Sequence, residues 1–155
     1  MVEQKDERTT AIGLATFAFE YIDSAMLVNQ ARGEVTLLSR ASYTPAYFLV
    51  LHGIELCLKS FLLHKGVELK VLESSYRHDL KKCLSEANKQ GLTDVFEFTE
   101  EDQLAFDLLI EINKNNQLRY IQTGFKTYPH WTIVEPFAVR LHKAVAKVVK
   151  GRSFG

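Results

Sequence analysis

Three polar side chains interrupt the most apolar stretch of this 155-residue chain. His52, Glu55 and Lys59 lie at positions i, i+3 and i+7, which places them on one strip of the helix that this stretch predicts. Glu55 and Lys59 form an i, i+4 pair with the acid toward the N-terminus, the more favourable order. An imidazole in such a strip has the chemistry of a general acid or base, and the strip then faces a cleft or a partner subunit. The alternative interpretation is that the strip is the single solvated edge of a central helix.

A second polar group precedes another predicted helix. Arg77, His78 and Asp79 bring a cation, an imidazole and a carboxylate next to backbone N–H groups that can hold an anion. Asp79 is better explained as the N-cap of that helix than as a catalyst. On the alternative interpretation, His78 simply packs or hydrogen-bonds beside the cap.

Basic and aromatic residues form a third group, made up of Arg119, Tyr120, Tyr128, His130 and Trp131. Arginine together with several aromatic rings in a loop is the composition that stacks bases and contacts phosphates. It is equally the composition of a loop that folds back to close a core. The pattern alone leaves both interpretations open.

A basic stripe is predicted on the last helix. Arg140, Lys143, Lys147 and Lys150 project within one narrow sector, and Arg152 follows them. Such a stripe has the charge to track a phosphate backbone. It also follows from the preference of basic residues for an exposed face and for a helix C-terminus.

Several catalytic patterns are absent from the sequence. There is no glycine-rich phosphate loop, no HExxH, no paired CxxC and no nucleophile-elbow serine, so we predict neither a metal nor a cofactor. Cys57 and Cys83 lie in apolar helical stretches and are predicted to be reduced core residues. Lys plus Arg and Asp plus Glu number 19 each, so the chain lacks the global field of a dedicated nucleic-acid binder.

The elements that must position these groups are all predicted to be helical. Hydrophobic residues make up 46% of the chain and charged residues 25%, and only three prolines and eight glycines interrupt it. The spacing of apolar residues predicts five helices, at 9–32, 46–65, 80–89, 100–114 and 136–150. We therefore expect an all-α, up-and-down helical bundle in one domain spanning 1–155, with its core at about 10–150.

Local signals predict where these helices begin and end. Gly33 and Gly66 are expected to end the first two, and Pro45 and Pro136 to lie near helix starts. Thr99 followed three residues later by an acid resembles a capping box. Small residues recur along the first helix and allow a neighbouring helix to approach closely. The segment 124–135 is expected to be an ordered aromatic loop, and 151–155 a frayed tail.

The sequence also bears on location. The charged first eight residues do not lead into a signal-peptide arrangement. The apolar run 47–51 is soon broken by the polar strip at His52, Glu55 and Lys59, so we expect no membrane span. The protein is predicted to be cytoplasmic.

Three stretches resemble the HEPN (higher eukaryotes and prokaryotes nucleotide-binding) family. The apolar run 46–66, with Glu55 and Lys59 four apart, resembles the central helix of HEPN domains. His78-Asp79-Leu80 resembles the His-Asp-Leu entry to the next helix, and Leu118-Arg119-Tyr120 resembles an Arg-Tyr element after the fourth helix. The resemblance covers roughly 10–150. It implies a bundle of four to five helices, commonly a homodimer, working in RNA or nucleotide biology and often in toxin–antitoxin or defence systems.

Catalytic HEPN members are metal-independent ribonucleases that carry an Arg followed, after four to six residues, by a His. No Arg–His pair in this chain has that separation. We therefore predict a non-catalytic HEPN-like module, a homodimer that binds RNA, a nucleotide or a protein partner. The candidate ligand-binding residues are His52, Glu55, Lys59, Arg77, His78, Arg119, Tyr120 and His130. The alternatives are a divergent ribonuclease and a structural or antitoxin-like subunit whose partner comes from the same operon.

Overall fold

Helices account for the long elements of the protein. The computed structural model describes residues 8–35, 44–114, 118 and 128–151, with the side chains of 32–35 excepted. Four long helices are α2 (Ala11–Val35), α3 (Thr44–His64), α6 (Glu100–Ile112) and α7 (Trp131–Val149). Two shorter helices are α4 (Leu69–Val71) and α5 (Leu80–Lys89), accompanied by a π-helical turn, η1 (Leu72–Tyr76), and a 3₁₀ turn, η2 (Leu92–Asp94). The described ranges contain no strand, and the prediction of an all-α bundle is confirmed.

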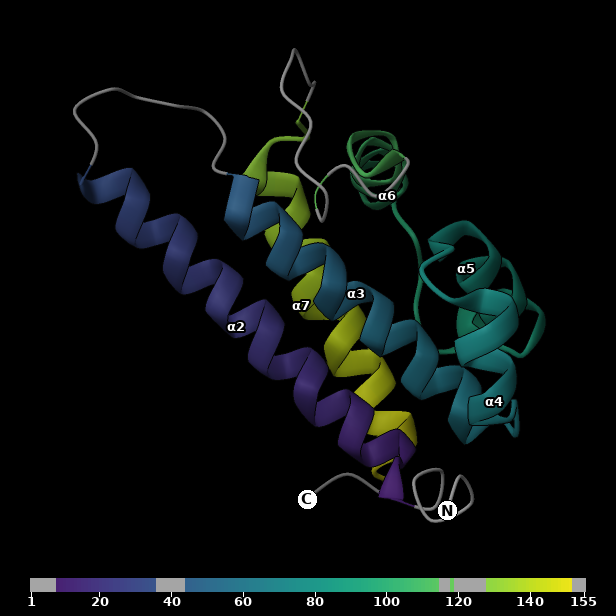
Figure 1. Cartoon of the computed structure of the whole chain (residues 1–155). Helices are drawn as coiled ribbons and strands as arrows, with labels where there is room; N and C mark the ends of the chain where they lie inside the picture. Colours follow the sequence, from purple (N-terminus) through teal and green to yellow (C-terminus); the bar gives the residue numbers. More distant parts are fainter. Residues whose placement is uncertain (1–7, 36–43, 115–117, 119–127, 152–155) are drawn as a thin grey trace.

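Helix α3 lies at the centre of the arrangement (Figure 1). Helices α2, α3 and α7 run beside one another and pack in all three pairwise combinations. Helix α5 packs on α3, and α6 packs on α7. Because it has neighbours on several sides, α3 buries twelve of its residues, which explains why its sequence is apolar nearly all round.

The seam between α2 and α3 is the tightest contact in the bundle. Ala15, Ala18 and Ala25 of α2 are fully buried there. A Cβ atom added to Gly53 of α3 would lie 2.6 Å from Cγ1 of Ile22, closer than two carbon atoms can pack. The predicted small-residue stripe therefore does let the two helices approach closely.

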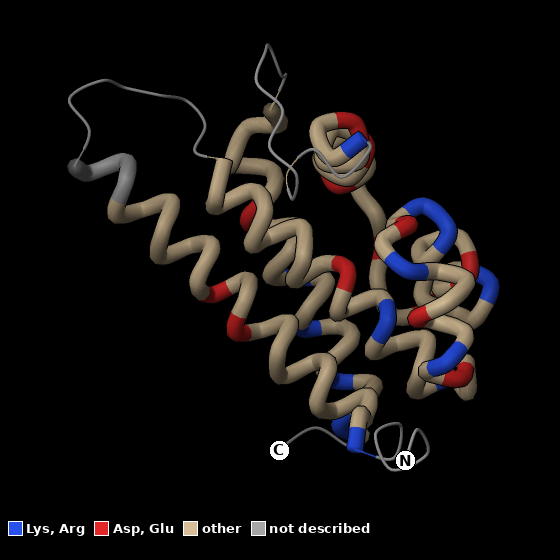
Figure 2. Tube along the Cα trace, viewed as in Figure 1, with Lys and Arg blue, Asp and Glu red and all other residues tan. Residues whose placement is uncertain are grey.

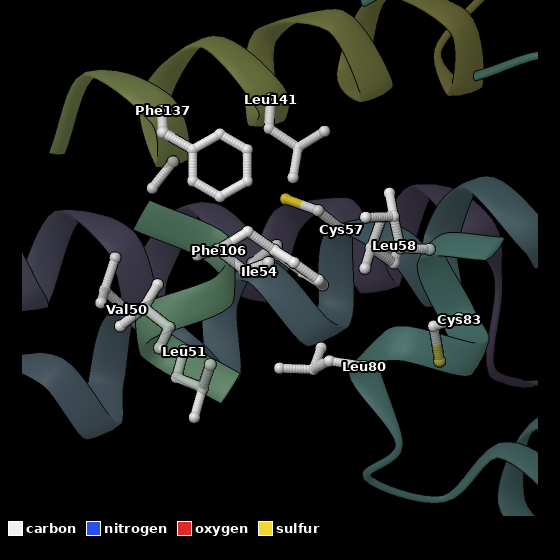
Figure 3. Packing of buried hydrophobic residues seen from close by; sticks show 14 of the residues in the cluster. Val50, Leu51, Ile54, Cys57, Leu58, Leu80, Cys83, Phe106, Phe137 and Leu141 are labelled. Carbon is white, nitrogen blue, oxygen red and sulfur yellow. The ribbon is translucent and has the colours of Figure 1, made fainter. Parts of the chain in front are cut away.

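A single apolar cluster fills the space between the helices (Figure 3). Ile54, Phe106, Phe137 and Leu141 bring α3, α6 and α7 together in it. Both cysteines are free and buried, as predicted, and Figure 3 shows them in the same cluster. Burial raises the pKa of the Cys83 thiol to about 11 and that of Cys57 further still, so both remain protonated at neutral pH.

Two of the predicted caps are present. The Asp79 carboxylate accepts a hydrogen bond of 3.0 Å from the Lys82 backbone N–H at the start of α5. At the start of α6 the Thr99 hydroxyl accepts from the Asp102 backbone N–H at 3.0 Å. The Asp102 carboxylate accepts in return from the Thr99 backbone N–H at 2.9 Å. Both signals depend only on residues three apart, which is why the sequence predicts them.

Several predicted boundaries are wrong. Helix α2 continues through Gly33 to Val35, and α7 begins at Trp131, so 131–135 is helix where a loop was predicted. Pro136 consequently lies inside α7, at a cost in backbone hydrogen bonding that the burial of Val134 and Phe137 offsets. The rest of the predicted loop at 124–127, and the predicted tail at 152–155, lie outside the described residues.

Two helices are long and apolar enough to cross a membrane by length and composition. These are the windows Ala11–Ala31 of α2 and Thr44–His64 of α3, although the polar strip on α3 predicted no span. The bundle buries 67% of the α3 window, as in the core helix of a soluble protein, but only 22% of the α2 window. Helix α2 therefore presents an apolar surface that the described part of the bundle leaves uncovered.

Candidate functional site

The carboxylate of Glu55 is the centre of a polar cluster on the outer edge of α3. Its side chain is only 8% exposed. The Lys59 ammonium donates to Glu55 Oε2 at 3.2 Å, and His52 Nδ1 lies 4.0 Å from the same oxygen. His78 Nδ1 lies 3.0 Å from Oε1 and 3.2 Å from Oε2. These four residues are called the Glu55 cluster below, and all four were among the predicted ligand-binding residues.

Two separate stretches of chain supply the cluster. Helical spacing puts the three α3 residues on one strip. His78 comes from a tight connection in which Arg77 ends η1 with a φ of 45°, a conformation that non-glycine residues rarely adopt. Asp79 then caps α5 immediately afterwards. The His78 backbone is thus fixed between a strained residue and a helix cap, which holds its imidazole against α3.

The contact with Glu55 sets the orientation of the His78 ring. An ionised carboxylate only accepts hydrogen bonds, so Nδ1 of His78 must be the donor. In the neutral imidazole this leaves Nε2 as the atom that can accept a proton or, once protonated, donate to an anion. The side chain of His78 is 42% exposed, and Nε2 is the ring nitrogen that does not contact Glu55.

His78 also lines a surface hollow of about 410 Å³ between the start of α5 and the end of α6. Its other charged residues are Lys81 and Lys114 against Asp79 and Glu111. The Asp79 carboxylate is already engaged by the α5 backbone. The two lysines have no ion-pair partner among the described residues. The hollow therefore offers Lys81, the His78 imidazole and the first turn of α5 on one wall, and Lys114 on the other.

His52 connects the Glu55 cluster to α2. Its ring contacts the Tyr21 ring edge-on, with centroids 4.5 Å apart, and lies parallel to the Phe48 ring at 6.4 Å. These contacts hold His52 beside Glu55 from the side opposite α5. The polar strip is therefore more than a solvated helix edge, because aromatic and charged neighbours fix its residues in place.

The other predicted site residues do not join the cluster. Arg77 is exposed, and its Nε donates to the Ser74 carbonyl at 3.3 Å. His130 is exposed at the start of α7; Tyr47 donates to the adjacent Pro129 carbonyl, so this corner lies near the first turn of α3, about 12 Å along the helix from Glu55. Arg119 and Tyr120 lie outside the described residues.

Arg140, the first residue of the predicted basic stripe on α7, is engaged within the fold. Arg140 Nη1 lies 2.8 Å from both carboxylate oxygens of Asp102, and Nη2 donates to the Glu97 carbonyl at 3.1 Å. Its guanidinium also lies over the Phe96 ring. Arg140 thus ties α7 to α6, and only Lys143, Lys147 and Lys150 remain as an exposed stripe.

Sequence reasoning did not find the hollow. Lys81 and Lys114 are 33 positions apart in the chain and carry no motif, so only the packing of α5 near the end of α6 brings them together. Within the described ranges, no group of three His, Cys, Asp or Glu residues is placed to hold a metal ion. No protein-family model, curated protein or solved structure matches the chain. The chemistry of the site must therefore be argued from its geometry.

Proposed function

We propose that the protein is a non-catalytic, HEPN-like binding module that holds the phosphate group of an RNA or a nucleotide at the Glu55 cluster and the adjoining hollow. One observation carries the proposal. Glu55 fixes His78, from a different segment, at the edge of a hollow that also contains Lys81 and Lys114.

The donors in the hollow suit a phosphate. The two lysine ammonium groups, together with His78 Nε2 once the imidazole is protonated, provide donors of the kind that bind phosphate oxygens. The first turn of α5 adds the positive end of the helix dipole and backbone N–H groups other than that of Lys82, which donates to Asp79. Glu111 and Asn113 on the opposite wall supply an acceptor and an amide, which suit the hydrogen-bonding edge of a base. A chain with no net charge thereby gains a local site for an anion.

The experiment compares two pairs of lysines. A fluorescein-labelled, single-stranded 12-nucleotide RNA is titrated with the protein, with unlabelled adenosine monophosphate as competitor to distinguish an RNA site from a nucleotide site. Replacing Lys81 and Lys114 by alanine is expected to weaken RNA binding about tenfold or more and to lower its salt dependence. The matched control replaces Lys143 and Lys147 of α7 and is expected to leave binding unchanged. The proposal fails if replacing the control lysines weakens RNA binding and replacing Lys81 and Lys114 does not.

A second candidate function is supported by the Glu55–His78 hydrogen bond. A carboxylate that orients an imidazole is the arrangement of a general base. His78 Nε2 would take the proton of a ribose 2′-hydroxyl, whose oxygen attacks phosphorus as the bond to the 5′-oxygen breaks. A lysine or water would protonate the leaving oxygen, giving a 2′,3′-cyclic phosphate. RNA cleavage that persists in EDTA and is lost in His78→Gln would establish this metal-independent ribonuclease over the binding module.

A further inference from the structure

The outer face of α2 is unusually apolar. Ile12, Phe17, Phe19 and Leu27 all belong to this helix, and each is between 50% and 60% exposed. Leu27 lies opposite the alanines that the bundle buries, whereas Phe17 borders α3 beside Leu49 and Phe19 borders α7, with its ring centroid 5.6 Å from that of His142. Exposed apolar side chains spread over the outer half of a helix mark a surface that another molecule covers.

The same face carries negative charge only. Between Thr9 and Ala31 the charged residues are Glu20 and Asp23, and no lysine or arginine occurs among them. In Figure 2 most of α2 is tan, and red marks its acidic positions near the middle of the helix. A surface of this kind attracts a basic partner and repels an acidic one.

A second hollow lies at the edge of this face, between α2 and α3. It measures about 260 Å³ and is lined by Phe17, Glu20, Tyr21, Ser24 and Leu49. Two aromatic rings and a carboxylate around one opening form the chemistry that receives an ammonium or guanidinium group, through cation–π attraction and an ion pair. The hollow therefore selects a Lys or Arg side chain.

From these observations we infer that α2 is the docking surface for an amphipathic, basic helix of a partner protein. The apolar side of that helix covers Phe17 and Leu27, and one of its Lys or Arg side chains enters the hollow beside Glu20. This surface adjoins the proposed phosphate site, because Tyr21 of the hollow also packs against His52 of the Glu55 cluster. Two other occupants fit less well. An anionic membrane surface is repelled by the carboxylates, and two α2 helices packed antiparallel about their middles would bring Glu20 and Asp23 close to their own copies.

The test uses two peptides and the full chain. The first is a helical peptide of about 18 residues with a leucine stripe flanked by lysines, and the second has every lysine replaced by glutamate. Fluorescence anisotropy is expected to show the basic peptide binding at least tenfold more tightly. Glu20→Lys is expected to reverse this preference, and Phe17→Ser to weaken binding of the basic peptide about tenfold. Glu73→Lys, which changes an exposed carboxylate on η1, is the matched control and should change nothing.

Other results would overturn the inference. Circular dichroism first establishes that each variant is folded. Equal binding of the two peptides, no binding of the basic peptide, or an effect of Glu73→Lys equal to that of Glu20→Lys would contradict a basic partner. Binding to phosphatidylcholine vesicles that Phe17→Ser abolishes would assign the face to a membrane. Self-association in sedimentation that Phe17→Ser abolishes would assign it to a second copy of the chain.

Discussion

Two buried carboxylates hold this molecule together in different ways. Asp102 on α6 and Glu55 on α3 have side chains that are 4% and 8% exposed. Asp102 is matched by the guanidinium of Arg140, which never loses its charge, and by the backbone of its own capping box. Glu55 is matched by one lysine and by two histidines, whose neutral rings each carry one donor and one acceptor nitrogen.

This difference separates a structural carboxylate from the one that we propose to serve a binding site. Every partner of Asp102 serves to begin α6 or to fasten it to α7, and no ligand is needed to complete the set. The partners of Glu55 instead include an exposed imidazole whose second nitrogen faces away from the carboxylate. A buried carboxylate thus indicates a binding site only when its partners reach the surface with unused hydrogen-bonding capacity.

The largest expected effect comes from breaking the structural pair. Asp102→Ala removes the carboxylate that accepts from the Thr99 backbone N–H in the capping box of α6, and it leaves Arg140 without its ion-pair partner. Because the Arg140 side chain is 43% exposed and can be hydrated, we expect a loss of roughly 2–4 kcal/mol in the free energy of unfolding rather than the full cost of a buried pair. Urea denaturation measures it. Glu55→Gln, the comparison variant, is expected to cost about 1 kcal/mol. Equal losses of unfolding free energy in the two variants would contradict the distinction between Asp102 and Glu55.

A smaller effect on stability is expected at His142, a histidine that is held differently from His78. His142 Nε2 lies 3.0 Å from the Ala15 carbonyl oxygen, so the neutral ring donates across the α2–α7 contact. Burial lowers the pKa of His142 below its usual 6.5. His142 therefore binds a proton more readily in the unfolded chain than in the folded protein. Its contribution to the free energy of unfolding is complete above pH 6.5 and is lost as the pH falls through the folded pKa.

The corresponding measurement is urea denaturation at pH 7.5 and at pH 5. Wild-type protein is expected to lose stability on acidification, and His142→Gln, which keeps an N–H donor but does not titrate, is expected to lose less. The change should be smaller than that caused by Asp102→Ala. An identical pH dependence in His142→Gln and wild type would show that the ring does not carry the effect.

The sequence predicts the parts of this structure that depend on neighbours within a turn of helix. The Asp79 cap, the Thr99 capping box and the strip at His52, Glu55 and Lys59 are all of this kind. The wrong boundary at Pro136 arises because burial of Val134 and Phe137 overrides a local helix breaker, whereas at Gly33 the helix runs past the glycine to Val35.

The part of the site that sequence reasoning missed depends on contacts between distant segments. Joining His78 to Glu55 requires the π-helical turn and the unusual Arg77 backbone, and neither has a sequence signature. The hollow requires the start of α5 to lie beside the end of α6. Chemistry that spans two segments therefore has to be read from the fold.

The most direct test is to measure RNA binding and stability on the same two variants, Glu55→Gln and Asp102→Asn. Both changes remove a buried carboxylate charge and keep the shape of the side chain. If Glu55 orients His78 for a phosphate ligand, Glu55→Gln weakens binding of the labelled 12-nucleotide RNA about tenfold and lowers the free energy of unfolding by only about 1 kcal/mol. Asp102→Asn leaves RNA binding unchanged and lowers the free energy of unfolding by more. Wild-type binding that Glu55→Gln leaves intact, or no binding by the wild-type protein, would contradict the assignment of the Glu55 cluster as a phosphate site.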